Sequence, residues 1–213
     1  MKQLLRHLFF CLVVRPVILL LLGVQVRFAD RLPSRGPAIL VANHNSHLDT
    51  AILMCLFPLR LLKWVRPVAA ADYWLKNRFI AYFALNIVGI IPISRTAAGA
   101  GGDLFAPISQ ALEQGSIIIF FPEGTRGEPE RLGKFKSGIA RLAERHPMIP
   151  IIPIFLHGAG KALPRGEGLL IPFLCDVFVG DAIFWNGDKH SFLPALEAKF
   201  ANQAREAGFE DWQ

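Results

Sequence analysis

Short, continuously apolar runs recur along the chain from residue 37 onward and alternate with segments of helical pattern. Strands that are covered on both faces produce such runs. The runs cover residues 38–42, 67–71, 87–93, 116–121, 149–155 and 175–179. The candidate helices between them cover residues 46–57, 72–85, 102–114, 138–144 and 193–207. Strands that alternate with helices predict an α/β fold with a largely parallel central sheet flanked by helices.

The beginning of the chain has a different pattern. Residues 8–26 form a nearly unbroken apolar stretch, close to the roughly 20 residues that a membrane-spanning helix needs. Arg15 and Pro16 lie in its middle. A central arginine costs about 2.5–3.5 kcal/mol in a bilayer, and a proline removes a helical hydrogen bond. Two short helices that break at this point and lie partly in one leaflet therefore compete with a single span.

Two other interpretations of this stretch are a cleaved signal peptide and a buried core helix. A basic start fits the former, but no small-residue cleavage site follows Val26. We expect residues 1–30 to be a retained membrane anchor and residues 31–213 to be the folded domain. The basic residues expected near lipid head groups are Lys2, Arg6, Arg27, Arg31 and Arg35.

The composition agrees with contact between the protein and a membrane. Of the 213 residues, 53% are hydrophobic and 19% are charged, whereas soluble domains average about 25% charged residues. This balance excludes intrinsic disorder. The net charge of +6 suits an anionic membrane surface or a phosphate-bearing substrate, and no basic helix or zinc spacing favours nucleic acid. The helix expected at 46–57 is apolar nearly all round, so it is buried or faces the membrane.

The sequence NHNSHLD follows the first predicted strand and opens the next helix. If His44 lies in the loop and Ser46 caps the helix, the carboxylate of Asp49 can turn back toward the imidazole. Such a carboxylate fixes the tautomer of the imidazole and makes His44 a general base. Two alternatives stay open, because Ser46 and Asp49 also suit a plain capping box and His47 is a rival base.

A strand of sequence GSIIIFF leads into a second loop, PEGTR. Gly124 lets the backbone approach a ligand closely, and Arg126 offers a fork of donors that matches phosphate. Glu123 either accepts a hydrogen bond from a substrate hydroxyl or holds Arg126 in place. Lys134 and Lys136 add cations near a helix start. The alternative is an ordinary strand-to-loop turn with a surface ion pair.

Two further segments carry weaker signals. The apolar run 87–93 delivers Arg95 near the end of a strand, where ligands bind in α/β sheets. Arg95 is either a second phosphate contact or an ordinary surface arginine. The run 149–154 contains Pro150 and Pro153, which are unusual in a central strand. We therefore expect an edge strand or the wall of an apolar cavity there.

Together these four segments resemble the glycerolipid acyltransferase family, typified by 1-acylglycerol-3-phosphate acyltransferase. The first block of that family, Asn-His-x4-Asp, matches Asn43, His44 and Asp49. The remaining blocks are Gly-x-Ile-x-Ile-x-Arg, Phe-Pro-Glu-Gly-Thr-Arg and an apolar run around a proline, and they match residues 89–95, 121–126 and 151–154. The resemblance spans roughly residues 37–158, and the order and spacing of all four blocks are very specific.

The resemblance implies an acyltransferase domain in which His44 deprotonates an acceptor hydroxyl and Asp49 orients His44. The hydroxyl then attacks an acyl thioester, and no covalent acyl-enzyme forms. The implied substrate-binding residues are Arg95, Glu123, Gly124, Thr125, Arg126, Lys136 and Pro153. The implied reaction converts 1-acylglycerol 3-phosphate to phosphatidic acid. The alternatives are another lysophospholipid or glycerol 3-phosphate as acceptor, a thioesterase or lysophospholipase with the same His–Asp pair, and a non-catalytic membrane-binding module.

The resemblance implies no cofactor, with acyl-coenzyme A or acyl carrier protein as the acyl donor. The expected partners are this donor and membrane lipids at the cytoplasmic face of a bacterial inner membrane. Oligomeric state stays open. The cysteines, Cys11, Cys55 and Cys175, are three in number and far apart, which predicts reduced thiols rather than disulfides. We expect no metal, because no further ligands cluster near the histidines.

Overall fold

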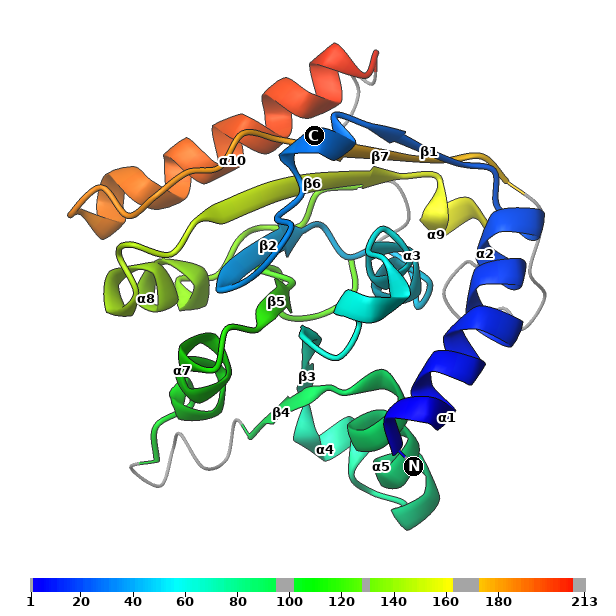
Figure 1. Cartoon of the computed structure of the whole chain (residues 1–213). Coiled ribbons are helices and arrows are strands. Elements are labelled where there is room, and N and C mark those ends of the chain that lie inside the picture. The colour runs from blue at the N-terminus through cyan, green and yellow to red at the C-terminus, as the bar shows by residue number, and fades with distance from the viewer. Residues whose placement is uncertain (1, 95–101, 128–130, 163–172, 209–213) are drawn as a thin grey trace.

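The computed structural model describes residues 2–94, 102–127, 131–162 and 173–208, and within them seven strands form one sheet (Figure 1). The strand order is β1-β7-β6-β2-β5-β3-β4. Neighbouring strands are parallel, except that β6 and β7 are antiparallel. The strands are β1 (Val24–Arg27), β2 (Ala38–Ala42), β3 (Val65–Ala70), β4 (Ile91–Ile93), β5 (Ile117–Phe120), β6 (Ile151–His157) and β7 (Cys175–Val179). The largely parallel α/β sheet expected from the sequence is confirmed.

Helices cover both faces of this sheet. The α-helices are α1 (Lys2–Phe9), α2 (Arg15–Leu21), α3 (Asp49–Cys55), α4 (Ala71–Trp74), α5 (Arg78–Phe83), α7 (Ala106–Glu113), α8 (Gly138–Arg145), α9 (Ala159–Ala162) and α10 (Lys189–Glu206). The π-helical segments are η1 (Phe10–Val14) and η4 (Ala84–Val88), and the 3-10 turns are η2 (Ala29–Arg31) and η3 (Leu59–Leu61).

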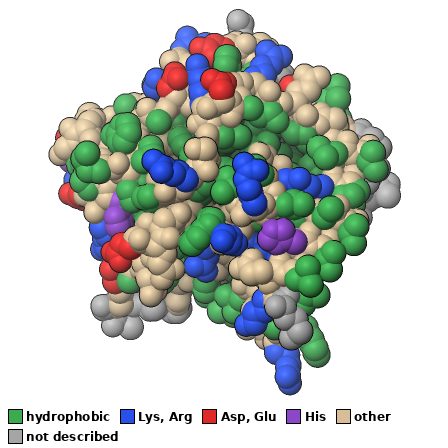
Figure 2. Space-filling view, in the orientation of Figure 1, with side chains coloured by type: hydrophobic (Ala, Val, Ile, Leu, Met, Phe, Trp, Pro, Cys, Tyr) green, Lys and Arg blue, Asp and Glu red, His purple; other side chains and the backbone are tan. Residues whose placement is uncertain are grey.

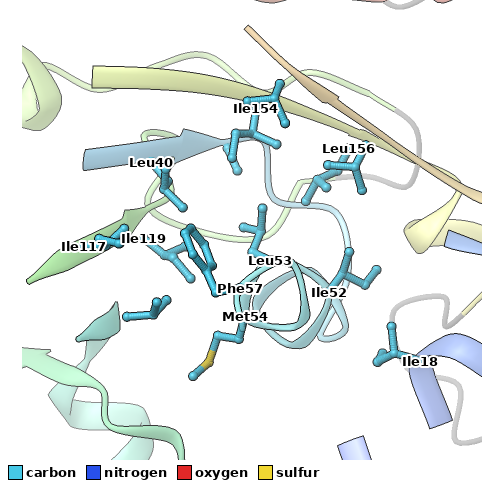
Figure 3. Close-up of a cluster of buried hydrophobic side chains, with 14 of the residues drawn as sticks. Ile18, Leu40, Ile52, Leu53, Met54, Phe57, Ile117, Ile119, Ile154 and Leu156 are labelled. Carbon is cyan, nitrogen blue, oxygen red and sulfur yellow. The ribbon is translucent and has the colours of Figure 1, made fainter. Parts of the chain in front are cut away.

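Helix α3 is buried rather than membrane-facing, which decides between the two interpretations of its apolar sequence. Ile52, Leu53 and Met54 have no exposed surface. Figure 3 shows Leu53 pointing toward the sheet and Ile52 lying on the side of Ile18 from α2. On the opposite face, α7, α8 and α10 bury a second apolar cluster against the strands. A parallel sheet covered in this way explains why its strands are apolar along their whole length.

The leading helix is continuous instead of breaking at Arg15–Pro16. Pro16 lies in the first turn of α2, where a proline's missing N–H is tolerated, and the π-helical segment η1 shifts the hydrogen-bond register just before it. Within the described residues, Lys2–Leu20 is the one helix long and apolar enough to cross a bilayer. The end of the predicted apolar stretch, residues 24–26, instead forms the edge strand β1 together with Arg27 and pairs with β7.

Two basic side chains of the leading helix bind the domain rather than lipid. Arg6 is buried and donates to the carbonyls of Val65 and Val88 at 3.0 and 2.9 Å. Arg15 donates to the carbonyl of Phe57 at 2.5 Å. The expectation that Arg6 lies near lipid head groups is therefore wrong, because backbone carbonyls at the sheet already satisfy its guanidinium.

Strand β6 is internal, between β7 and β2, so the expectation of an edge strand from its prolines is wrong. The carbonyl of Pro153 accepts from the backbone N–H of Gly180 at 2.8 Å and from the side chain of Gln203 at 3.3 Å. The antiparallel register with β7 begins only at Ile154. Pro153 lies one residue outside that register, so its missing N–H removes no bond from the paired residues 154–157.

Candidate active site

The candidate catalytic groups lie at the carboxyl ends of two neighbouring strands. β2 leads into His44 and β5 leads into the loop 121–127, and these strands pair in parallel register. The two loops are joined directly, because the backbone N–H of Gly127 donates to the carbonyl of His44 at 2.9 Å. Asn43 fixes the first loop further by exchanging two hydrogen bonds with the backbone of Leu156, at 2.8 and 2.7 Å. This edge is where ligands bind in open α/β sheets.

His44 and Asp49 form a hydrogen-bonded pair. The distance from Nδ1 of His44 to Oδ2 of Asp49 is 2.9 Å. The same oxygen accepts from the backbone N–H groups of Asn45 and Ser46, at 2.7 and 2.8 Å. Asp49 is the first residue of α3 and has no exposed surface. The carboxylate therefore turns back over its own loop and orients the imidazole.

This geometry combines two interpretations that the sequence left as alternatives. The bond from the Ser46 N–H to Asp49 is one half of a capping box, yet the same carboxylate also contacts His44. The helix begins at Asp49 rather than Ser46, so the predicted start was three residues early. The hydroxyl of Ser46 instead accepts from the N–H of Leu48 at 3.3 Å.

A stacking contact on one face of the imidazole ring also fixes the position of His44. It stacks on Phe121 with the ring centroids 4.0 Å apart and an angle of 19° between the planes. With Nδ1 donating to Asp49, Nε2 carries the lone pair, and it has no hydrogen-bond partner among the described residues. The side chain is 20% exposed and lines a cavity. This is the arrangement that a general base requires.

Glu123 supports the histidine loop instead of facing the cavity. Its Oε1 accepts from the backbone N–H of His44 at 2.9 Å, and Glu123 is buried. Its other oxygen lies so close to Gly133 that a Cβ there would be 2.5 Å away. Burial, with a smaller contribution from the nearby charge of Asp49, raises the pKa of Glu123 to about 7. The lining of the cavity does not include Glu123.

Cationic and polar groups gather at the mouth of the cavity. Gly124, Thr125, Arg126 and Lys136 all line it. Gly124 adopts a φ of 72°, and a Cβ there would lie 3.1 Å from the ammonium of Lys136. Any side chain at residue 124 would thus be strained and would displace that cation. Figure 2 shows hydrophobic side chains over much of one face of the molecule, with lysine and arginine side chains among them.

His47 is paired with the cation cluster rather than with Asp49. The guanidinium of Arg126 donates to Nε2 of His47, so His47 is neutral in this arrangement. Partial burial, followed by the positive charge of Arg126, lowers the pKa of His47. His47 lines the cavity, but its contact with Arg126 occupies the nitrogen that a base would use. His44 is therefore the better placed of the two candidate bases.

The cavity itself has a volume of ≈ 690 Å³, within the usual range of about 300–1,000 Å³ for ligand pockets. Its polar end is formed by His44, His47 and the cations, and much of the remaining wall is apolar. The leading helix supplies Phe10 and Val14 to this wall, and the segment after β3 supplies Tyr73, Trp74 and Phe83. The sequence reasoning did not find this wall, because residues so far apart along the chain meet only in the folded protein.

Two of the predicted substrate-binding residues, Glu123 and Pro153, do not line the cavity. Pro153 lies in β6, with its ring against Gly180, and does not line the cavity. Arg95 belongs to residues 95–101, which lie outside the described part of the chain. Within the described residues, no group of three His, Cys, Asp or Glu side chains is placed to hold a metal ion.

Comparison with known proteins places this geometry in context. The acyltransferase family profile matches residues 23–157. The 1-acyl-sn-glycerol-3-phosphate acyltransferase BAT2, chloroplastic, of Brassica napus is 32% identical over 153 residues, which cover 68% of this chain and 41% of that protein. The 1-acyl-sn-glycerol-3-phosphate acyltransferase alpha of Mus musculus is 31% identical over 176 residues, which cover 81% of this chain and 59% of that protein.

A solved structure shares the fold. It is the crystal structure of the 1-acyl-sn-glycerophosphate (LPA) acyltransferase, PlsC, from Thermotoga maritima, which superposes with a TM-score of 0.74 and 16% sequence identity. The match covers 95% of this chain and 78% of the other.

Proposed function

The chain belongs to the acyltransferase family, and from this premise we propose that it acylates 1-acylglycerol 3-phosphate to phosphatidic acid in phospholipid biosynthesis. The acyl group comes from an acyl thioester, either acyl-coenzyme A or acyl-acyl carrier protein. One observation carries the proposal: the oriented His44–Asp49 pair lies in a cavity that is cationic at one end and apolar along its walls. Such a cavity suits an acceptor with an anionic head and a fatty chain. Two relatives of the chain are 1-acyl-sn-glycerol-3-phosphate acyltransferases by name, which agrees with this acceptor.

The reaction begins with proton transfer to His44. Nε2 takes the proton of the acceptor hydroxyl while its oxygen attacks the thioester carbonyl carbon. Asp49 stabilises the imidazolium that forms and keeps the ring in place. General-base assistance of this kind contributes about 10²–10⁴-fold in rate.

The tetrahedral intermediate then collapses. The carbon–sulfur bond breaks as the new ester bond remains, and the imidazolium of His44 returns its proton to the leaving thiolate. The net change is one ester formed, one thioester lost and one free thiol, so no external base is consumed. Because both substrates are held in one cavity, positioning supplies a further part of the rate.

The acceptor's phosphate binds at the cationic mouth. Arg126 offers paired N–H donors and Lys136 a single charged ammonium. His47 adds no charge while it is neutral, but it holds the guanidinium of Arg126 over the cavity. The acyl chains lie along the apolar walls, where each buried methylene contributes about 0.8 kcal/mol.

The leading helix supports association of the protein with a membrane. Its outer side exposes large apolar side chains, namely Leu4, Leu5, Leu8, Leu12, Val13, Val17, Leu19 and Leu20. Its inner side packs on the domain through Phe10 and Ile18. We place this helix in the leaflet that faces the cytoplasm, with its length along the domain surface, so that amphiphilic substrates reach the cavity from the lipid.

The test is a radiolabelled acyl-transfer assay on membranes from cells that express wild type or His44→Ala. The acceptor panel contains 1-acylglycerol 3-phosphate, glycerol 3-phosphate and lysophospholipids with larger head groups. We expect transfer to 1-acylglycerol 3-phosphate by wild type only, with the variant still in the membrane fraction. Equal rates without a phosphomonoester would refute the assigned acceptor. Thioester loss that does not respond to added acceptor would instead establish a thioesterase.

A further inference from the structure

A second apolar surface lies beside the leading helix, on the segment that follows β3. Phe79 is 77% exposed, and its neighbours Ile80 and Tyr82 are about half exposed. Arg78–Val88 is also a continuous apolar helix, too short to span a bilayer. We call the exposed side chains of this region the aromatic face, which comprises Tyr73, Leu75, Phe79, Ile80, Tyr82, Phe83 and Leu85. Monomeric soluble proteins rarely expose contiguous apolar patches of this kind without a function.

The aromatic face continues the outer surface of the leading helix. Phe9 of α1 and Phe83 of α5 meet edge to face, with their centroids 5.2 Å apart. Helix α1 packs along η4, and the side chain of Arg6 reaches the carbonyl of Val88 at its end. Figure 1 shows α1 and α5 side by side at the same corner of the molecule. The exposed apolar side chains of the two elements therefore lie at the same corner of the molecule.

Charge identifies the partner of this surface. Of the charged residues in the segment 72–88, Lys76 and Arg78 are basic and Asp72 is acidic, so the segment has a net positive charge. Lys76 and Arg78 flank the aromatic face, and the guanidinium of Arg78 lies 5.8 Å from the ring centre of Phe79. Apolar side chains with basic neighbours match a leaflet that carries anionic lipids.

The cavity reaches this same corner. Its apolar wall takes Phe9 and Phe10 from the leading helix and Tyr73, Trp74 and Phe83 from the segment after β3. Tyr73 and Phe83 thus belong both to the aromatic face and to the cavity wall.

We propose that the aromatic face is a second membrane contact, which inserts into an anionic leaflet next to the leading helix, so that lipid substrates enter the cavity between the two. The entry route rests on the proposed function, whereas insertion of the aromatic face does not. Phe79 and Ile80 are the side chains that enter deepest, because they are exposed and do not line the cavity.

The test compares a double variant, Phe79→Ser with Ile80→Ser, with a matched control, Met148→Ser with Phe184→Ser. The control also removes two exposed large apolar side chains, but far along the chain from the aromatic face. Binding of the purified full-length proteins to vesicles of equal parts phosphatidylcholine and phosphatidylglycerol is measured without substrate. We expect the partition coefficient of the double variant to fall about tenfold or more, and that of the control to stay within about twofold.

A second measurement tests whether the variants are correctly folded. Transfer between a water-soluble short-chain acyl-coenzyme A and a short-chain acceptor is compared for all three proteins. We expect the double variant to keep this rate to within about twofold while it loses activity on vesicle-bound acceptor. Vesicle binding that is unchanged in the double variant would overturn the inference. So would self-association of wild type in buffer that the same substitutions abolish, because a second copy would then be the partner.

Because binding is measured without substrate, its outcome does not depend on the reaction. A protein that binds vesicles through the aromatic face but transfers no acyl group would contradict the proposed function alone. A protein that transfers acyl groups but binds vesicles equally well after the substitutions would contradict this inference alone.

Discussion

The carboxylate of Glu123 accepts a hydrogen bond from the backbone N–H of His44 at 2.9 Å, which ties the loop after β5 to the loop after β2. Glu123 does not line the cavity, whereas Arg126, three residues later, does. One short motif therefore contains a residue that holds the base in place and a residue that faces the substrate. The two roles lead to different kinetic predictions.

Glu123→Ala is expected to lower kcat and to leave the acceptor KM within about twofold, because the residue positions His44 without touching substrate. A loss of about 100-fold in kcat corresponds to a small displacement of the base. Glu123→Gln keeps an oxygen acceptor for the His44 N–H, so its loss should be less than about tenfold. Steady-state kinetics on both variants measure this. A raised acceptor KM at unchanged kcat would show that Glu123 binds substrate after all.

The same residue predicts a pH-dependent stability. The folded protein raises the pKa of Glu123 from 4.5 to about 7 through burial, so between these values the folded state holds a proton that the unfolded state has lost. The stability that this proton provides is present at low pH and is lost as pH rises through about 7. The free energy of unfolding of wild type, minus that of Glu123→Gln, should therefore fall between about pH 5 and pH 8. Urea denaturation at several pH values tests it, and parallel curves would contradict it.

Asp49→Asn is expected to lower kcat by about 10²–10⁴-fold with little loss of stability. The amide oxygen still accepts from the backbone N–H groups of Asn45 and Ser46, but the charge that supports the imidazolium is gone. Asp49→Ala should in addition lower the free energy of unfolding by about 1–3 kcal/mol, because buried donors lose their acceptor. Kinetics and urea denaturation on both variants separate the two effects. Equal destabilisation by both substitutions would argue that the pair is structural only.

Arg126→Ala is expected to raise the acceptor KM by about 10–100-fold and to change kcat by less than about threefold. The reason is the loss of the guanidinium from the mouth of the cavity. Arg141→Ala is the matched control, because Arg141 is exposed on α8 and lies outside that cavity. An equal KM increase in both variants would mean that general positive charge, rather than Arg126, attracts the acceptor.

Val14→Trp is expected to shift the acyl preference toward shorter chains. Val14 lines the cavity, whereas the adjacent Val13 points outward and is 46% exposed. Filling the wall should lower kcat/KM for a long-chain donor about tenfold and leave a short-chain donor nearly unaffected. Val13→Trp adds the same ring outside the cavity and should change neither. Assays with a series of acyl-coenzyme A chain lengths compare them.

The sequence predicted the sheet well where strands are buried on both faces. Ala38–Ala42 and Cys175–Val179 have the predicted bounds, because their neighbours are strong turn or loop signals. Val24–Arg27 was missed because it extends the apolar stretch of the leading helix without a change in pattern. Residues 87 and 88 read as strand but belong to the π-helical segment η4, which ends at Gly89 with a φ of 76°.

The candidate site was predicted where local spacing determines it and missed where tertiary packing does. His44 and Asp49 lie five residues apart, and the turn between them brings their side chains together. The orientation of Glu123 toward the His44 backbone depends on the pairing of β2 with β5, which no local pattern encodes. The apolar wall depends on packing between α1 and η4.

The leading helix supplies part of the cavity wall through Phe10 and Val14, and its Arg6 satisfies the carbonyls of Val65 and Val88. Deleting residues 2–21 to avoid detergent would therefore remove one side of the cavity wall. It would also leave those two carbonyls without the hydrogen bonds that Arg6 donates. The same helix therefore determines both the need for detergent and the integrity of the cavity, so a truncation that improves solubility should also lower activity.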